Sequence, residues 1–528
     1  MNSPKKILKQ YYGYKSFRSQ QEEIINSILQ KQDTLVLMPT GGGKSLCYQI
    51  PALCLNGITL VISPLVSLMK DQVDALNANS IPAAYLNSTL SAMQIQEIEH
   101  KLLEGSIKLL YIAPERLASK SFRNLVSKLQ ISLIAIDEAH CISEWGHDFR
   151  PDYKRLKSLK GLTKGAPIIA LTATATKKVR NDIIKQLELD EVKVFQSSFN
   201  RDNLEIEVRE KKNSLAQILA LLEKNKNEST IIYCHSRDEA KSLCDELNHY
   251  GFKSLLYHAG LSDKIREKNQ ELFLEDKAKI VVATIAFGMG IDKSNVRLVI
   301  HNTFSKSLEN YYQEIGRAGR DGVKSKCILF YSQRDVKRHE FFVSKMTNSN
   351  SRKESQIKLR EMNNFCIATT CRKKSILEYF DEEVEFTNCG SCDICLNKSP
   401  ESVNLPLKLG SYDKELFSEL KNLRSQLAKD LDTVPTYLFN DKTLEYIAHK
   451  LPTTESKLLE IEGITKQKLL DFGDDILMLV QEHNMAHEVS KNIVKIKPSV
   501  MEEDEKFVKK PKVYKKKRYK KAYKKRKY

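Results

Sequence analysis

The stretch Asp33-Thr34-Leu35-Val36-Leu37-Met38-Pro39-Thr40-Gly41-Gly42-Gly43-Lys44-Ser45 decides the fold of this chain. Its apolar, β-prone start predicts a buried strand, and residues 46–55 read as a buried helix. Between them, glycines let backbone N–H groups turn toward phosphate oxygens, and Lys44 adds a cation. A plain glycine turn is the alternative, and the strict motif has glycine where Met38 stands. The residues expected to hold a nucleotide here are Thr40, Gly41, Gly42, Gly43, Lys44 and Ser45.

A second motif, Asp137-Glu138-Ala139-His140, follows an apolar run at residues 132–136. Both carboxylates would emerge at the carboxyl end of a parallel strand, where α/β sheets bind ligands. We predict that Asp137 and Ser45 hold Mg²⁺ and that Glu138 orients or deprotonates the attacking water. A solvated Asp-Glu pair at a strand end is the alternative.

A third motif, Gln313-Glu314-Ile315-Gly316-Arg317-Ala318-Gly319-Arg320, indicates why the chain should have two lobes. Hydrolysis of ATP concentrates negative charge on the γ-phosphoryl group, and an arginine delivered from a neighbouring domain is worth roughly 10³ to 10⁵ in rate. Arg317 and Arg320, three residues apart on a predicted helix, suit that task. A salt-bridging helix face is the alternative.

The composition is that of a globular protein with a basic tail. At 528 residues and 41% apolar, the chain exceeds the ~250–300 residues at which single cores stop growing, so we expect three or more domains. No stretch approaches the ~20 uncharged residues of a membrane span and no secretory segment follows Met1, so we expect a cytosolic protein without membrane contact. Of the net charge of +18, +14 falls in residues 506–528. Eleven cysteines, an odd number, favour free thiols and a metal site over disulfides.

Two series of apolar runs alternate with helical patterns, which is typical of parallel α/β domains. The runs are 34–38, 58–62, 108–112, 133–136 and 168–171 in a first domain (1–200), and 230–233, 254–257, 280–283, 298–300 and 327–331 in a second (201–340). The second domain has no phosphate loop of its own. The remaining segments are a polar helical region with a cysteine cluster (341–398), a linker (399–411), a compact helical domain (412–482) and a lysine-rich tail expected to be disordered (483–528).

With these motifs placed, the chain closely resembles the RecQ family of superfamily 2 DNA helicases from about residue 11 to residue 396. Besides the motifs above, the matching segments are 12–21, 63–69, 141–150, 170–175, 231–237 and 282–293. The resemblance implies two RecA-like parallel-sheet domains, then a helical zinc-binding subdomain, a small all-α HRDC-like domain and the basic tail. It also implies that Tyr14, Arg18 and Gln21 contact the adenine base, and that Gln313 acts with Arg317 and Arg320.

The segment Cys141-Ile142-Ser143-Glu144-Trp145-Gly146-His147-Asp148-Phe149-Arg150 resembles the aromatic-rich loop with which this family senses single-stranded DNA. Its chemistry agrees, because the Trp145 and Phe149 rings offer base-stacking surfaces worth ~1–3 kcal/mol each. Arg150 adds charge and cation–π contact. We predict DNA contacts from Trp145, His147, Phe149 and Arg150. Two rings packed in a core are the alternative.

Four cysteines predict a structural zinc site. Cys371 precedes Cys389-Gly390-Ser391-Cys392-Asp393-Ile394-Cys395, and four thiolates suit tetrahedral zinc with no vacant position. A ferredoxin-type iron–sulfur cluster would place its fourth cysteine soon after Cys395, where Leu396-Asn397-Lys398 stand. An iron–sulfur cluster and unligated thiols remain as alternatives. The RecQ zinc subdomain has the same layout, and Cys366 is left over.

The chain departs from many RecQ proteins after the cysteines, because only about sixteen residues separate Cys395 from Tyr412 and a winged helix cannot fit there. The segment 412–480 resembles the HRDC accessory domain instead. Lysine clusters and tyrosines in the tail suit a nonspecific clamp on about 5 phosphates of a single strand, which would steepen the log–log salt slope by about 3.5. A solubilising or localisation segment is the alternative.

Together these patterns predict an ATP- and Mg²⁺-dependent DNA helicase with structural Zn²⁺, acting in repair or recombination, with 3′-to-5′ polarity implied by the family. The expected partners are single-stranded, forked or recombination DNA, a single-strand-binding protein and recombination proteins, and the expected state is a monomer. The expected location is the cytoplasm at the nucleoid, or the nucleus in a eukaryote. The alternatives are a single-strand translocase that unwinds weakly, a binding or annealing scaffold with a vestigial motor, and an RNA helicase.

Overall fold

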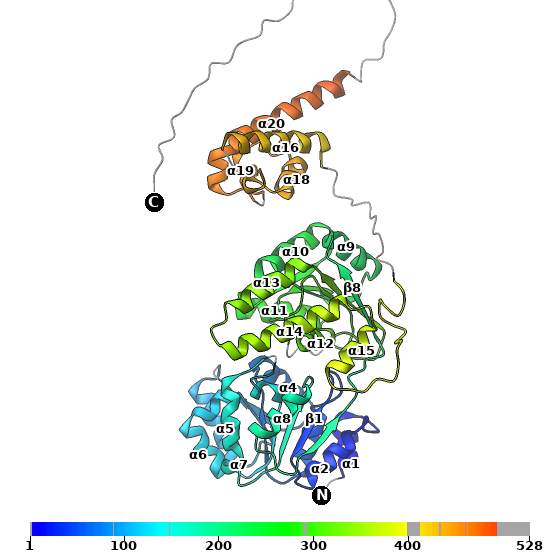
Figure 1. Ribbon diagram of the computed structural model, residues 1–528. Helices are drawn as coiled ribbons and strands as arrows, with labels where there is room; N and C mark the ends of the chain where they lie inside the picture. The colour runs from blue at the N-terminus through cyan, green and yellow to red at the C-terminus, as the bar shows by residue number, and fades with distance from the viewer. Residues whose placement is uncertain are drawn as a thin grey trace, which may run out of the picture. The chain divides into compact units, whose positions relative to one another are not determined.

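The computed structural model describes residues 3–87, 89–146, 148–288, 293–398, 412–431, 435–461 and 463–493. The chain forms two compact units that divide at residue 405. The first unit contains two parallel α/β lobes and a cysteine-containing subdomain, and the second contains a small helical domain (Figure 1). In the described part of the chain, no helix is both long and apolar enough to traverse a lipid bilayer.

The first lobe is built on a parallel sheet whose central strands are buried on both faces. In sheet order, its strands are β3 (Ala83–Leu86), β4 (Leu109–Ile112), β2 (Ile58–Ile62), β5 (Ile131–Ile136), β6 (Ile168–Thr172), β1 (Thr34–Leu37) and β7 (Lys193–Gln196). Along β1, Leu35 and Leu37 pack into one apolar cluster and Val36 packs into another. This alternation explains the continuous apolar runs in the sequence, because helices cover each face of the sheet.

Helices and 3-10 turns connect these strands. They are α1 (Pro4–Tyr12), α2 (Gln21–Leu29), α3 (Leu46–Cys54), α4 (Val66–Ala78), α5 (Ala92–Leu103), η1 (Pro114–Ala118), α6 (Lys120–Lys128), η2 (Ala139–Ile142), η3 (Pro151–Ser158), α7 (Leu159–Leu162) and α8 (Lys177–Gln186). Because every strand pair in the sheet is parallel, the loops that follow the strands meet along one edge. The phosphate loop and the Asp137-Glu138 pair both lie in such loops.

The second lobe repeats the architecture. In sheet order, its strands are β10 (Ser254–Tyr257), β11 (Ile280–Ala283), β9 (Ser229–Tyr233), β12 (Val296–His301), β13 (Ser325–Tyr331) and β8 (Leu204–Glu210). Its helices are α9 (Ser214–Lys224), α10 (Arg237–His249), α11 (Asp263–Leu274) and α12 (Leu308–Ile315). The predicted runs all fall on strands, whereas β3, β7 and β8 were missed.

The cysteine-containing subdomain follows β13. It consists of α13 (Gln333–Ser344), α14 (Ser349–Ile367), α15 (Arg372–Tyr379) and the cysteine knuckle after them. The knuckle adjoins the edge strand of the second lobe, because Asp393 N donates to Ile206 O at 3.0 Å and Val208 N donates to Asp393 Oδ2 at 3.1 Å. The subdomain is therefore tied to the sheet of the second lobe.

The second unit is all-helical, as predicted. Its helices are α16 (Lys414–Asp430), α17 (Pro435–Leu438), α18 (Asp441–Lys450), α19 (Glu455–Leu459) and α20 (Lys466–Ile493). They enclose a core that includes Leu420, Leu444 and Ile476, and Arg424 donates to Phe439 O at 2.9 Å. Helix α20 continues past residue 482, where the sequence had suggested the start of a disordered tail. Residues 494–528, with the predicted clamp, lie outside the described residues, as does the linker 399–411.

Candidate active site

The phosphate loop has the predicted strand–loop–helix setting, between the end of β1 at Leu37 and the start of α3 at Leu46. Gly43 has a φ of +85°, and a Cβ at this position would lie 2.4 Å from Gln21 Nε2. Glycine is therefore required here by both backbone conformation and space. The start of α3 presents N–H groups and the positive end of the helix dipole to this loop. The arrangement suits an anion.

Lys44 lies on the loop where it can reach both the phosphates and the carboxylates. Its Nζ donates to Met38 O at 3.0 Å, so the residue that replaces the motif's glycine contributes through its backbone. Burial lowers the pKa of Lys44, and the negative charges of Glu138 and Asp137 oppose that shift. A bound polyphosphate would add further negative charge and stabilise the ammonium form.

Asp137 and Glu138 directly follow β5, at the edge of the sheet that carries the phosphate loop. Asp137 is fixed from two sides, because its N–H donates to Ile62 O at 2.9 Å and its carbonyl accepts from Tyr153 Oη at 3.0 Å. Burial and the neighbouring Glu138 charge raise the pKa of Asp137 to about 7. A bound divalent cation would stabilise the ionised form of these two adjacent carboxylates.

Glu138 connects the site to the second lobe. The residue has a left-handed backbone (φ 48°), and its Oε2 lies 3.3 Å from His140 Nδ1. The same Nδ1 lies 2.9 Å from Thr172 Oγ1, and Gln313 Nε2 of the second lobe donates to Thr174 Oγ1 at 3.4 Å. The His140, Thr172 and Thr174 side chains thus link the surroundings of Glu138 to Gln313 of the second lobe.

Arg320 packs against the phosphate loop of the first lobe, and the charges of Arg317 and Arg320 both act on residues of that lobe. Burial raises the pKa of Glu138, and the charges of Lys44 and of Arg317 from the second lobe oppose that shift. A Cβ on Gly41 would lie 3.4 Å from Arg320 Cγ, and the charge of Arg320 contributes to the lowered pKa of Lys44. The structure therefore brings together the cation and carboxylates of one lobe with the two guanidinium groups of the other.

The predicted base-contact residues lie beside the phosphate loop. Gln21 Nε2 donates to Gly43 O at 3.1 Å, and Arg18 Nη1 donates to Gly41 O at 2.8 Å. Tyr14 is 54% exposed, which leaves its ring available for stacking. Arg18 and Gln21 therefore lie against the phosphate loop.

Arg201 is a residue of this site that the motif search missed. It lies between β7 and β8, in the segment that joins the two lobes, and it contacts both of them. Its Nη1 donates to Thr40 O of the phosphate loop at 3.2 Å, and its Nη2 donates to Ala318 O and Gly319 O at 3.0 and 2.8 Å. One guanidinium thus connects the phosphate loop to the arginine segment. No glycine or carboxylate pattern surrounds Arg201 in the sequence, so only spatial proximity reveals it.

The aromatic loop of the first lobe also contacts the cysteine-containing subdomain, although His147 lies outside the described residues. Trp145 is partly buried, its carbonyl accepts from Lys358 Nζ at 2.7 Å, and Lys178 Nζ lies 3.2 Å from the ring centroid. Arg150 Nη1 donates to Pro64 O at 2.8 Å, next to the predicted DNA-backbone segment 63–69. The Phe149 ring is also partly exposed, with Lys154 Nζ 5.3 Å from its centroid. Both residues are partly exposed, each ring has one lysine ammonium over it, and Trp145 also packs against the apolar core.

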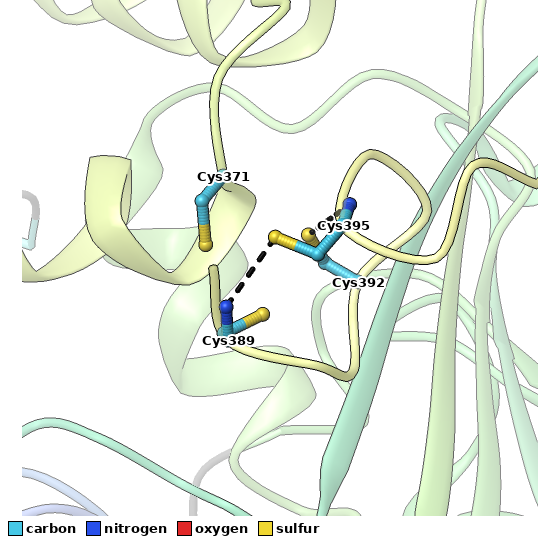
Figure 2. Close-up of side chains that lie close together, drawn as sticks. All are labelled: Cys371, Cys389, Cys392 and Cys395. Carbon is cyan, nitrogen blue, oxygen red and sulfur yellow. Dashed lines mark hydrogen bonds between the residues drawn. The ribbon is translucent and has the colours of Figure 1, made fainter. Parts of the chain in front are cut away.

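The four predicted cysteines come together. Figure 2 shows Cys371 on its own segment, opposite the knuckle that carries Cys389, Cys392 and Cys395. Their sulfur atoms all lie within 4.8 Å of one another, and backbone N–H groups of Cys389 and Cys395 point at Sγ atoms of the cluster, at 3.3 and 3.4 Å. Cys366 is buried but stands outside the cluster. Four convergent sulfurs suit tetrahedral zinc with no open position.

A buried ion pair joins the segment that carries Cys371 to the cysteine knuckle. Arg372, directly after Cys371, donates from Nε to Asp393 Oδ1 at 3.0 Å and from Nη2 to Asp393 Oδ2 at 3.1 Å. Such a bidentate pair fixes the relative position of two segments more strictly than a single contact. Lys373 Nζ then donates to Arg201 O at 2.8 Å. The cysteine subdomain is therefore joined to the segment that connects the lobes.

Comparisons with known proteins agree with this arrangement. The DEAD/DEAH box helicase family matches residues 18–182, and the helicase conserved C-terminal domain matches residues 210–322. The RecQ zinc-binding family matches residues 333–396, and the HRDC domain matches residues 413–480.

Proteins of similar sequence are named as RecQ helicases. The chain is 37% identical to the "ATP-dependent DNA helicase RecQ" of Haemophilus influenzae, over 90% of this chain and 95% of that relative. It is 46% identical to the protein of that name from Bacillus subtilis, over 74% of this chain and 66% of that relative. A crystal structure of the DUF1998 helicase MrfA bound to DNA matches with a TM-score of 0.54 at 18% identity, covering 73% of this chain and 59% of that one, which shows a shared fold.

Proposed function

The chain belongs to the RecQ family of helicases, and from this premise we propose that it is an ATP-dependent DNA helicase that moves 3′-to-5′ along single-stranded DNA and unwinds duplexes during repair or recombination. One observation carries the proposal. Lys44, Asp137 and Glu138 of one lobe lie opposite Arg317 and Arg320 of the other.

ATP would bind between the lobes. The backbone N–H groups of the phosphate loop and the Lys44 ammonium would hold the phosphates, while the Tyr14 ring, Arg18 and Gln21 would hold the base. Glu138 would orient the attacking water and take its proton. Arg317 and Arg320 would stabilise the negative charge that develops on the transferred phosphoryl group.

The residues present fit a magnesium ion. When bound, Mg²⁺ would neutralise charge on the β- and γ-phosphates, and Asp137 with the Ser45 hydroxyl would hold it. Two adjacent buried carboxylates, with the pKa of Asp137 raised partly by the Glu138 charge, support this assignment because a bound cation would relieve their repulsion.

The cysteine cluster would hold structural zinc. Zinc binding of roughly 10–16 kcal/mol in finger-like peptides acts as folding energy, and a segment this short cannot build a large core of its own. The ion would therefore fix the knuckle against β8 and, through Lys373, support the segment around Arg201.

Single-stranded DNA would contact the aromatic loop. A base that stacks on the Trp145 ring has to compete with the Lys178 ammonium, which lies over that ring. The loop follows directly after His140, so a change in the Trp145 position would reach Glu138 through a short stretch of backbone. Phe149, Arg150 and His147 complete the proposed DNA contacts.

Weak unwinding is the second candidate function, and the short linker supports it. The alignment with the Haemophilus influenzae relative is 592 positions long and includes 90% of this 528-residue chain, or about 475 residues. More than a hundred positions of the alignment therefore have no residue from this chain. A chain without a strand-separating wing would translocate on single strands but open forks poorly. Translocation on single strands and unwinding of forked duplexes, assayed side by side, separate the two functions.

ATPase stimulation tests the function directly. Single-stranded DNA should stimulate ATP hydrolysis more than duplex DNA or RNA does, and Trp145→Ala should reduce that stimulation more strongly than it changes the rate without DNA. Equal or stronger stimulation by RNA would favour an RNA helicase. A rate of ATP hydrolysis that none of these nucleic acids changes would contradict the proposal.

The proposal also includes the oligomeric state, the cellular location and the partners of the protein. We expect a monomer that works at the nucleoid in the cytoplasm, or in the nucleus of a eukaryote, with a single-strand-binding protein and recombination proteins as partners. Light scattering during size-exclusion chromatography tests the monomer, because a stable dimer would double the mass.

A further inference from the structure

Helix α13 carries an exposed stripe of aromatic and cationic side chains that the motor described above does not use. Arg334, Arg338, Phe341 and Lys345 recur at the spacing of one helical face, and Phe342 stands beside them. Phe341 is 58% exposed and Phe342 is 56% exposed. Two large aromatic rings exposed to water at adjacent positions indicate an interaction surface.

The stripe is held in a fixed orientation by the opposite face of the helix. Val336 and His339 are buried there, and His339 Nε2 lies 3.0 Å from Phe304 O. Asp335 is also buried and pairs with Lys211 at 2.9 Å. Because these contacts fix the helix, the phenylalanine rings are presented without a further cost of ordering the backbone.

The rings form a continuous aromatic surface with a histidine of the second lobe. Phe341 and Phe342 meet edge to face with centroids 6.0 Å apart, and Phe342 lies 5.9 Å from His235. Burial lowers the pKa of His235, as does the charge of Arg338, so the imidazole is neutral near pH 7. Phe341, Phe342 and His235 thus form a row of aromatic rings in which the faces are inclined to one another.

Cations surround this surface. Lys345 Nζ lies 5.3 Å from the Phe341 ring centroid, and the exposed Lys306 lines a pocket of about 370 Å³ together with Phe342 and His235. Arg338 pairs with Glu239 at 2.7 Å, so its charge is partly balanced. Glu340 is exposed on the same helix, and the lysines and arginines outnumber these acids.

We propose that Phe341 and Phe342, with Lys306 and Lys345, form a stacking platform for single-stranded DNA where helix α13 of the cysteine-containing subdomain meets the second lobe, separate from the aromatic loop. Bases stack on aromatic rings without sequence preference, and flanking cations follow the phosphates, which is the chemistry this surface offers. The proposal rests on the DNA-directed function above. The α13–α14 pair also places the platform on the subdomain that contacts the aromatic loop, because Lys358 of α14 donates to Trp145 O.

Binding of a single-stranded oligonucleotide without nucleotide tests the platform. Phe341→Ala combined with Phe342→Ala should weaken the affinity at least about fivefold, since the loss of one base–ring stack accounts for that much. Phe341→Tyr with Phe342→Tyr should restore it. Met93→Ala, which removes another exposed apolar side chain (79% exposed) on α5, should leave affinity unchanged.

Two further measurements separate stacking from a general surface effect. A 2-aminopurine probe placed along the oligonucleotide should be quenched at one or two positions, and the double alanine variant should lose that quenching. Lys306→Gln with Lys345→Gln should lower the log–log salt slope by about 1.4, which is 0.7 for each phosphate that the protein no longer engages.

The proposal is overturned if the double alanine variant binds single-stranded DNA and quenches the probe like the wild type. Failure of the proposed helicase function can be distinguished from failure of the proposed stacking platform. A wild-type protein that lacks DNA-stimulated ATPase would disprove the helicase, whereas the binding assay uses no ATP and still reports on the rings.

Discussion

The two lobes share one order of strands, to which the first lobe adds β7 at its edge, and they differ in the loops that follow the strands. After β1 the first lobe has the glycine-rich stretch that ends in Lys44, whereas after β8, the corresponding strand, the second lobe has Lys211-Lys212-Asn213 and then α9. In the second lobe that turn is closed by Gln217 Nε2, which donates to Lys212 O at 2.9 Å. The fold is therefore common to both lobes, and the ability to bind phosphate depends on one loop.

A corresponding difference follows the central strands. In the first lobe β5 leads into Asp137 and Glu138, whereas in the second lobe β12 leads toward α12 and the two arginines. One lobe thus carries the negative groups and a lysine, and the other carries guanidinium groups. Neither lobe holds all the parts that phosphoryl transfer requires, so movement of the lobes can control hydrolysis.

The largest expected effect comes from replacing Lys44 of the phosphate loop with alanine, compared with the same replacement of Lys212 in the corresponding loop of the second lobe. Lys44→Ala should reduce DNA-stimulated ATP hydrolysis by about 10³-fold, because a charge that contacts the reacting phosphates is removed. Lys212→Ala, at the corresponding loop of the second lobe, removes an exposed lysine paired with Glu210 and should change little. The measurement is steady-state ATPase at saturating DNA. Equal losses in both variants would mean that the first lobe has no special role.

The second expected effect concerns the cysteine cluster. Cys392→Ala should abolish zinc binding, reduce soluble yield and weaken DNA binding more than nucleotide binding, because the knuckle against β8 loses its folding energy. Cys366→Ala removes a nearby buried thiol outside the cluster and should keep one zinc per chain. Zinc content by atomic emission and DNA affinity are measured together. A soluble, zinc-loaded Cys392→Ala protein would refute the ligand assignment.

The third expected effect concerns Arg201, which joins the phosphate loop to the arginine segment. Arg201→Ala should lower kcat for ATP hydrolysis by about 10²-fold through misplacement of Arg317 and Arg320, with little change in ATP affinity. Arg201→Lys keeps the charge but not the forked donor geometry and should fall between. A variant that loses ATP affinity and thermal stability with kcat unchanged would show a merely structural role.

The smallest expected effect belongs to the basic tail. Truncation after Asp504 should reduce affinity for single-stranded DNA by about tenfold near physiological salt and lower the log–log salt slope by about 3.5, if the tail grips about 5 phosphates. A slope that does not change would exclude the clamp and leave a solubilising or localisation segment.

The sequence was sufficient for the parts of this structure that depend on local pattern. The β1–loop–α3 unit, the carboxylates after β5 and the four cysteines all follow from short stretches with strict geometric needs. Edge strands such as β3 and β7 were missed because they are only partly buried and lack a continuous apolar run. Arg201 could not be found in this way, since its role depends on three carbonyl groups that are distant in sequence.

The central claim is that two lobes share one catalytic site. Its most direct test measures ATP affinity and DNA-stimulated hydrolysis in one preparation of Arg317→Ala combined with Arg320→Ala. The account predicts nearly unchanged ATP binding and a loss of about 10³-fold or more in kcat, because the guanidinium groups act on the transition state. Hydrolysis at the wild-type rate would contradict it.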